Sequence, residues 1–490
     1  MTDGEAPAAP VPRSRLLAQQ TVSVRNVALI VASAMFMEQM DGTVLATALP
    51  TMAKSLGTDP LHMNVALTSY LLSLAVFIPA SGKVADRFGA RGVFSAAIAL
   101  FTLGSILCAQ APDLSFLVAS RILQGIGGAM MVPVGRLVLL RSSSKSELVT
   151  AMAWLQIPSS IGPILGPPIG GFIVTYLDWR WIFYINVPIG VLGIVLVTLY
   201  IEDVRETGRV RFDFAGMALS GVALACLMWG IEMGSRGFGS SGEALALLAV
   251  GAVLAVLYRR HARHHPQPVL NFRLMRIPTF RISVLAGTCS RIVAGSVPFL
   301  LPMMLQLGFG MSAAQSGLIT FTSAAGSLAM KTVAPRALRR LGFRNTMVWI
   351  GLAATLLSAS VAFFRPSWPL SAIYGLLLVA GFVQSLQFMA YNTIAYADLP
   401  RGQMSAATSF YTTFQQLALS LGIAVSAASL AFSSKLRGHA TLQLSDFTCA
   451  FLVVAAVALL APLLSLTMKP SAGDELSGHH AGPAPQRPTS

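Results

Sequence analysis

Long apolar stretches recur along the whole chain, and they constrain its fold more than any other feature. A helix needs about 20 mostly apolar residues to cross a bilayer, and the sequence contains about fourteen such stretches between polar breaks. Only 11% of the residues are charged, against about 25% in soluble domains, so the chain is an integral membrane protein. We predict an all-α fold with spans at 27–49, 62–82, 92–110, 114–140, 150–176, 181–201, 212–233, 243–258, 279–307, 312–334, 345–364, 369–392, 404–432 and 447–468.

The seventh and eighth stretches give the weakest span predictions. The segment from Glu243 to Tyr258 is short and follows a Gly/Ser-rich loop, so the sequence is also compatible with twelve spans. The two ends, 1–24 and 469–490, lack the apolar content to fold alone, and we predict disordered cytoplasmic tails. The first tail is acidic and rich in Pro and Ala instead of basic, which predicts no cleaved signal peptide.

The net charge of +15 follows the membrane topology. Of the 34 lysines and arginines, 25 fall in alternate loops and tails that start with the N-terminal tail, six in the opposite loops, and three inside spans. Basic residues concentrate on the cytoplasmic side of membrane proteins. We therefore predict a multi-pass protein of the bacterial inner (cytoplasmic) membrane with both termini in the cytoplasm, and no nucleic-acid partner.

Two inner loops carry related patterns. The loop "GKVADRFGARG" (82–92) and the segment "RALRRLGFR" (336–344) match at an offset of 253 residues, with Arg87, Gly89 and Arg91 aligned to Arg340, Gly342 and Arg344. Such internal repeats are typical of secondary transporters, whose binding site lies between the repeats. We predict an N-terminal six-helix bundle at 25–205, two inserted transmembrane helices at 206–262 and a C-terminal six-helix bundle at 263–468.

The loop at 82–92 has the features of a gating loop. Gly82 and Gly89 permit the backbone turns that a short helix–loop–helix connection needs. Asp86 lies close enough in sequence to Arg87 and Arg91 to pair with them.

Charged residues inside apolar spans are the main functional signal. They are Glu38 and Asp41 in the first span, Arg121 and Arg136 in the fourth, and Arg291 in the ninth. A charge at the bilayer centre costs about 2.5–3.5 kcal/mol, so such residues face a cavity or a partner. Glu38 and Asp41 are three residues apart and share one helix face. The alternative is a permanent Asp41–Arg121 pair that only holds two helices together, because structural ion pairs also place charged residues in buried positions.

The fifth span carries a regular pattern of small residues. In "IPSSIGPILGPPIGGF" glycines and prolines recur every four residues: Gly162, Pro163, Gly166, Pro167 and Gly170, followed by Gly171. Glycines on one face let helices approach closely, and prolines favour bending. We predict a bent helix that seals or hinges one wall of a cavity, with helix packing alone as the alternative.

Four motifs in order resemble one transporter family. "MDGTVLATALP", "GKVADRFGARG", "RILQGIGGAMMVPVGR" (with Arg121, Gln124 and Gly125) and "GPILGPPIGG" are similar to motifs of the major facilitator superfamily, in its fourteen-span drug:proton antiporter branch of the EmrB/QacA type. Within this branch the chain resembles the bacterial MdtD and HsrA subgroup. It departs from the first-helix motif at Ala46, where Asn is usual, and Glu38 is not part of that motif.

The resemblance implies a cavity lined by the first and fourth helices of each half. Its candidate substrate-cavity residues here are Gln39, Gln124, Trp154, Gln156, Arg291, Gln384, Gln387 and Asn392. Asp41, Glu38 and Arg121 become the candidate proton-coupling residues, with Asp41 as the proton carrier and Glu38 as a reader of substrate charge. The implied partners are protons, a small-molecule substrate and the lipid bilayer, with no cofactor and no metal.

Three functions remain compatible with the sequence. The first is proton-coupled export of amphipathic drug-like compounds, and the second is export of an organic anion such as a carboxylate, held by the buried arginines. The third, a non-transporting membrane protein, lacks support because no nucleophile–base set or soluble domain is present. No GxxxxGK[ST] motif occurs, so ATP is not the expected energy source. The four cysteines are scattered singly, and His261, His264 and His265 fit a solvated basic loop better than a metal site. The sequence gives no indication of a periplasmic adaptor.

Overall fold

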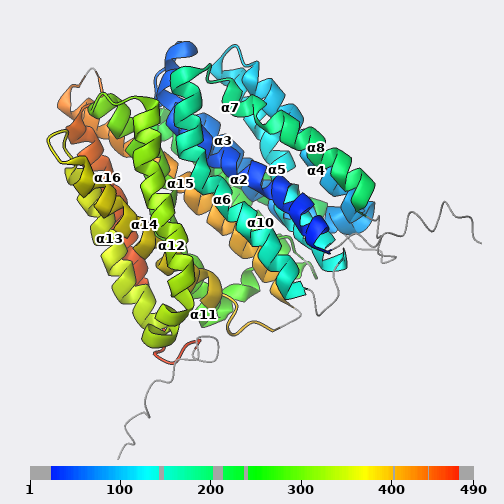
Figure 1. The fold of residues 1–490 in the computed structure, drawn as a ribbon. Helices are drawn as coiled ribbons and strands as arrows, with labels where there is room; N and C mark the ends of the chain where they lie inside the picture. Colours follow the sequence, from blue (N-terminus) through cyan, green and yellow to red (C-terminus); the bar gives the residue numbers. More distant parts are fainter. Residues whose placement is uncertain are drawn as a thin grey trace, which may run out of the picture.

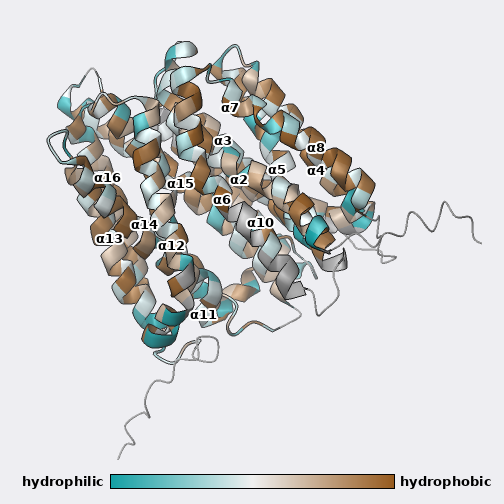
Figure 2. Ribbon diagram, viewed as in Figure 1, coloured by the Kyte–Doolittle hydropathy of each residue, from teal (hydrophilic) through white to brown (hydrophobic). Residues whose placement is uncertain are grey.

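The structure is a computed structural model that describes residues 24–142, 148–201, 213–236, 241–266, 268–400, 403–439 and 441–473. Over these residues the chain is helical, with turns between the helices and no strand. The apolar stretches form helices because a helix satisfies its backbone N–H and C=O groups within its own segment, as hydrocarbon requires. Figure 2 shows hydrophobic residues along the helices and hydrophilic ones gathered toward the helix ends.

The first half of the chain forms the helices of the first six predicted spans, and a short helix and the longer one that follows it together form the sixth. The helices are α2 (Val24–Ser55), α3 (Asn64–Phe88), α4 (Ala90–Ala109), α5 (Leu114–Ser142), α6 (Leu148–Tyr176), α7 (Trp181–Tyr184) and α8 (Asn186–Tyr200).

An inserted hairpin and the helices of the six later predicted spans follow. The hairpin consists of α9 (Phe214–Arg236) and α10 (Ser241–His264), which pack along each other. The later helices are α11 (Pro278–Met303), α12 (Ala313–Asn345), α13 (Gly351–Ser360), α14 (Leu370–Ile394), α15 (Met404–Arg437) and α16 (Leu444–Ser465). One-turn π-helices at Met304–Gly308 and Thr346–Ile350 extend α11 and precede α13, and short 3-10 turns lie at Phe272–Arg276 and Val361–Phe363.

Each predicted span corresponds to a helix of the structure. Within the described residues, twelve helices are long and apolar enough to cross a membrane, and both hairpin helices are among them. The other two predicted spans are α6, whose described apolar part Ile161–Tyr176 is short, and α12, which carries basic residues along its second half. Both hairpin helices therefore have the length and composition of membrane spans, and the total of fourteen spans stays a prediction.

The two halves use the same helix pairs. In each half the first helix packs along the fifth (α2 with α6, α11 with α15), and the second packs along the fourth (α3 with α5, α12 with α14). Between the halves the pairing is reciprocal, because α3 packs on α15 and α6 on α12. Figure 1 shows these halves side by side, with α6 and α12 adjacent at the centre.

Contacts between the halves concentrate at one end of the bundle, where α6 ends and α12 begins. A Cβ added to Gly171 would lie 2.4 Å from the Ala313 carbonyl oxygen, so the two backbones touch. Gln306 Nε2 donates to the Thr47 carbonyl at 3.0 Å, and the Ala314 amide donates to Thr175 Oγ1 at 3.0 Å. The largest hydrophobic cluster contains residues of both halves at this end. In the ribbon the halves converge there, toward the top of Figure 1.

Three predicted boundaries differ from the structure. Gly82 lies within α3, which continues to Phe88, so the prediction that Gly82 forms a turn is wrong: the residues after it are compatible with helix and the turn is made at Gly89 alone. Most of 336–344 is the end of α12 instead of a loop. Residues up to Gly473 fold back onto the second half, where Ala472 packs against a cluster around Phe343.

Candidate functional site

The centre of the first half holds a buried ion pair. Arg121 of α5 is fully buried, and its Nη1 donates to Asp41 Oδ2 of α2 at 2.5 Å. Arg121 Nε donates to the Ala66 carbonyl at 3.1 Å, and the guanidinium lies 4.2 Å from the centroid of the Tyr70 ring. Because a buried charge without a partner is costly, this pairing explains how an arginine is accommodated at the middle of a span.

Asp41 is held from three directions. Its Oδ1 accepts hydrogen bonds from Gln124 Nε2 at 2.9 Å and from Asn186 Nδ2 at 3.1 Å, in addition to the Arg121 contact. Gln124 is bound in turn, because its Oε1 accepts from Arg121 at 2.6 Å and its Nε2 also donates to Ser105 at 2.8 Å. Both oxygens of this buried carboxyl group are therefore satisfied by hydrogen bonds. Asn186 was not among the residues predicted from the sequence, although an amide in the apolar stretch "INVPIG" is a signal of the same kind as the charges.

Glu38 has a different environment one turn earlier on α2. Its side chain is buried, and within the described part of the chain Oε1 accepts only a long hydrogen bond of 3.4 Å from Tyr70, while Oε2 is buried without a partner. The Tyr70 ring also carries the Arg121 guanidinium on its face. The two carboxyls are therefore connected through Tyr70 and Arg121, but only Asp41 has a full set of donors.

The second half holds a buried arginine with a different set of neighbours. Arg291 of α11 is 2% exposed, and its Nη2 donates to Asn392 Oδ1 at 2.8 Å and to the Tyr411 hydroxyl at 2.6 Å. The guanidinium also lies 5.0 Å from the centroid of the Phe388 ring. Its Nε is buried without a hydrogen-bond partner, and within the described residues Arg291 forms no ion pair. This cation thus lacks the acid that Arg121 has.

The other predicted cavity residues are spread over several environments. Gln384 Nε2 lies 3.4 Å from the Ser290 carbonyl between α14 and α11, near Arg291. Gln387 is 2% exposed and points into the second half beside Gly351, so it is remote from the interface between the halves. Arg136 is exposed and, like Arg291, lies close enough to Tyr396 to affect it electrostatically.

Three further predicted residues lie on α2 and α6. Gln39 is half-buried, and its Cβ is 3.2 Å from the position of a Cβ added to Gly162. Trp154 is 39% exposed, with the Arg25 guanidinium 6.0 Å from its ring centroid. The side chain of Gln156 lies outside the described part of the structure.

The glycines of α6 form a close-packed seam with α2, the helix that carries both carboxyls. A Cβ added to Gly162 would lie 2.9 Å from the Phe36 carbonyl, one on Gly166 would lie 2.0 Å from Thr43 Oγ1, and one on Gly170 would lie 2.6 Å from Thr47 Oγ1. On the other face of α6, the Pro167 carbonyl and Gly171 contact α12. Pro163 and Pro167 lie within a continuous helix. This stripe of small residues thus lets α6 pack closely against α2 of its own half and against α12 of the other half.

The inner turns of both halves are built alike. Gly89 has φ +90° between α3 and α4, and Gly342 has φ +72° at the break near the end of α12. Arg91 donates to the Thr198 carbonyl near the end of α8, and Arg344 donates to the Leu466 carbonyl after α16 at 3.3 Å. In each half an arginine therefore ties this turn to the last helix. Arg87 is exposed, with its guanidinium 5.4 Å from the Phe88 ring centroid, and the Asp86 side chain lies outside the described part.

The histidine cluster belongs to the hairpin. His261 Nε2 lies 2.7 Å from Oδ1 of Asp213, the residue before α9, and His265 Nδ1 lies 3.9 Å from its Oδ2. Burial alone would raise the pKa of Asp213, but the Gly216 amide and His261 more than offset this, so the pKa lies below its ordinary value. No group of metal ligands is found among the described residues. This cluster therefore ties α10 to the start of α9.

The fold and the paired buried charges define a secondary transporter. The sequence profile of the Major Facilitator Superfamily matches residues 31–423 and 284–488, and the chain belongs to this superfamily. It is thus a multi-pass membrane transporter and not an enzyme. "Putative multidrug resistance protein MdtD" of Serratia proteamaculans (strain 568) is 41% identical over 418 residues, which cover 84% of this chain and 86% of that protein.

Solved structures of the same fold include distant transporters. The D-xylose-proton symporter superposes with a TM-score of 0.65 at 15% identity and covers 91% of this chain and 98% of its own. A point mutant of the nucleoside transporter NupG gives a TM-score of 0.63 at 16% identity over 90% of this chain and 99% of its own. At these identities the likeness concerns the fold alone.

Proposed function

We propose that the protein exports amphipathic drug-like small molecules from the cytoplasm by exchanging them for protons. The name of the MdtD relatives supports the drug-like substrate class, and the buried carboxyls of α2 support the coupling. With both termini in the cytoplasm, as the distribution of basic residues predicts, the tightly packed end of the bundle faces outward. The structure then corresponds to the inward-facing state of an alternating-access cycle.

Glu38 is the proposed proton carrier, and the environment of its carboxyl group is the observation that carries the proposal. Its Oε2 is buried without a partner and its Oε1 has one long hydrogen bond, so the neutral, protonated carboxyl is the stable form in this state. Asp41, by contrast, accepts hydrogen bonds from Arg121, Gln124 and Asn186 on its two oxygens. This assignment reverses the roles that the sequence suggested for the two residues.

Tyr70 is the proposed link between proton and conformation. Its hydroxyl contacts Glu38 and its ring lies under Arg121, so loss of the Glu38 proton places a second negative charge beside the Asp41–Arg121 pair. A rearrangement that repositions Arg121 or opens the site to water would relieve this repulsion. The free energy of proton release is thereby coupled to the free energy of the conformational change.

Transport by purified protein in liposomes tests the proposal. Efflux of a lipophilic fluorescent cation should require a proton gradient that is acid on the outer side, and dissipating the gradient should stop it. Uphill movement that survives a collapsed gradient, or that follows a counter-substrate gradient instead, would contradict proton exchange.

Arg291 favours a second candidate function, the export of an organic anion. This cation is buried, has no acid partner among the described residues and keeps an unbonded Nε. A carboxylate could accept a charge-assisted hydrogen bond from this guanidinium. The same liposomes scanned with lipophilic cations and carboxylates separate the two functions: uptake of carboxylates that is lost in Arg291→Gln would favour the second.

A further inference from the structure

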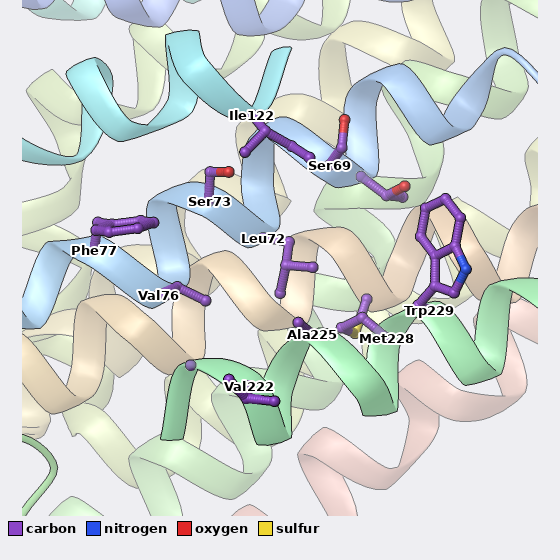
Figure 3. A pocket seen from close by; sticks show the side chains of 12 residues that line it. Ser69, Leu72, Ser73, Val76, Phe77, Ile122, Val222, Ala225, Met228 and Trp229 are labelled. Carbon is purple, nitrogen blue, oxygen red and sulfur yellow. The ribbon is translucent and has the colours of Figure 1, made fainter. Parts of the chain in front are cut away.

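A groove outside the charge network lies where the inserted hairpin meets both halves. Its volume is about 260 Å³, and its walls come from α3, α5 and α9 (Figure 3). Ala75 of α3, Met228 of α9 and Leu417 of α15 pack together beside it as a separate small hydrophobic cluster. The groove therefore adjoins the seam between α3 and α15, which belong to opposite halves.

The residues that line the groove carry no charge and offer few groups for hydrogen bonding. Nine of the twelve lining residues are apolar, and the other three are Thr68, Ser69 and Ser73. Thr68 Oγ1 and Ser69 Oγ donate to carbonyls of their own helix, at 3.3 and 3.4 Å. A ligand of this groove thus gains van der Waals contacts, not ion pairs. The volume exceeds the ~150 Å³ that holds one benzene molecule in an engineered cavity.

The mouth of the groove opens at membrane depth. Three lining side chains at its edge are exposed: Val222 by 50%, Trp229 by 45% and Ile122 by 41%. The α3 wall runs from Thr68 to Phe77, about 13 Å along the helix at 1.5 Å per residue, and this stretch lies within the span Asn64–Gly82. The α9 wall, from Gly221 to Trp229, lies within the span Phe214–Ile231. The surrounding solvent at this depth is hydrocarbon.

We infer that the groove binds one acyl chain of a bilayer phospholipid. An elongated, uncharged recess within two spans, with exposed apolar side chains at its edge, is complementary to a hydrocarbon chain from the surrounding bilayer. Because lipid and helix surfaces are equally apolar, the gain comes from filling space that the three helices leave open. The bound chain lies between α9 and the first half beside the α3–α15 seam. The hairpin thereby serves as one wall of a lipid site at the interface of the two halves.

Photo-crosslinking in vesicles tests this inference. The full-length protein is reconstituted in phosphatidylethanolamine and phosphatidylglycerol with a small fraction of a phospholipid that carries a diazirine on one acyl chain, and labelled peptides are mapped by mass spectrometry. Label is expected to be enriched several-fold on 68–77 and 221–229 over the lipid-facing surface of α16. Uniform labelling of all lipid-facing helices would overturn the inference.

Matched variants make the test specific. Ala225→Trp fills the groove from α9 and should remove the enrichment, whereas Val253→Trp, at a position of α10 that is 58% exposed, should leave it unchanged. Ala225→Phe serves the same purpose if the larger side chain prevents folding. Enrichment that persists in folded groove-filling variants would refute the site. Loss of label on addition of tetraphenylphosphonium would assign the groove to an exported cation instead, and neither result depends on proton coupling.

Discussion

The carboxyl groups of Glu38 and Asp41 are one helical turn apart and yet differ in every contact. Asp41 accepts from three side chains, and Glu38 has one long hydrogen bond and a buried, unpartnered oxygen. In many sites two similar carboxyl groups in different environments take different roles, one as a permanent charge and the other as a proton donor or acceptor. At this scale the unsatisfied group is the functional candidate, because the satisfied one gains little from a change of state.

Replacing each carboxyl tests this division. Glu38→Gln should abolish proton-driven transport but leave substrate exchange without a gradient largely intact, because Gln keeps size and polarity but carries no titratable proton. Asp41→Asn leaves Arg121 buried without its counter-ion, which should cost about 3–5 kcal/mol and lower the thermal unfolding temperature in detergent. Both variants are assayed for exchange, driven transport and unfolding. Normal driven transport in Glu38→Gln together with a stable but uncoupled Asp41→Asn would return the proton to Asp41.

Several helices of this protein meet through glycines at which a side chain would clash with the neighbouring helix. The seam of α6 against α2 has no room for a side chain at Gly166, whereas Gly375 of α14 has no neighbour within 4 Å of an added Cβ. Close approach of this kind stabilises helix pairs in membranes by van der Waals contact. The stripe therefore sets where α2, with its two carboxyls, lies relative to α6 and α12.

Gly166→Leu should fold poorly or transport at a small fraction of the wild-type rate, since the side chain would meet Thr43. Gly375→Leu is the matched control and should transport normally. Transport assays are normalised to the amount of folded protein from fluorescence-detected size exclusion. Wild-type rates in Gly166→Leu would show that the seam tolerates separation and has no role in the cycle.

The inner turns make a second prediction about elements. Gly89 and Gly342 have φ of +90° and +72°, a region in which a residue with a Cβ costs about 1–3 kcal/mol. Gly89→Val and Gly342→Val should each lower the unfolding temperature by a similar amount, because the two turns are equivalent in the two halves. Gly92→Val is the control, since Gly92 lies in α4 with open space around its Cβ. An unchanged unfolding temperature in either turn variant would argue against the strained turn.

The whole molecule is closed at one end by contacts between its halves. Gln306 of the second half donates to the Thr47 carbonyl of the first, and a hydrogen bond of this kind contributes about 1 kcal/mol, or roughly fivefold in an equilibrium. Gln306→Ala should shift the population toward the outward-open state. Alkylation of a cysteine placed at Thr43 from the outside reports this shift. Equal rates of alkylation in the protein with Gln306 and in the Gln306→Ala variant would mean that other contacts hold this end of the bundle closed.

Topology is the second prediction at this scale. Single cysteines at Asp59 and Phe238 should react with an impermeant reagent added to cells, and those at His265 and Arg340 should react only after permeabilisation, in a background with the four native cysteines replaced. The expectation follows from the 25 basic residues that fall in one set of loops. Protection of position 238 together with labelling at Asp59 would show that the hairpin does not cross.

The sequence by itself determined the features that depend on local composition. Apolar length located the helices, because a bilayer acts on each segment separately. The motifs identified the superfamily, and the orientation read from the charge distribution stays a prediction. Even the match of Gly89 with Gly342 was readable from residue spacing. The exact ends of α3 and α12 were not, since helix formers continue both helices past the apolar stretch.

Only the tertiary structure decided which buried groups are paired. Asp41 meets Arg121 across 80 residues and Asn186 across 145, and helix packing determines such partners, not the spacing along one helix. Among the described residues the same packing left Glu38 and Arg291 without counter-ions, placed Gln387 away from the interface and opened the groove beside α9. The sequence specified which residues are costly to bury. Their neighbours in space, which no single segment specifies, determined how that cost is met.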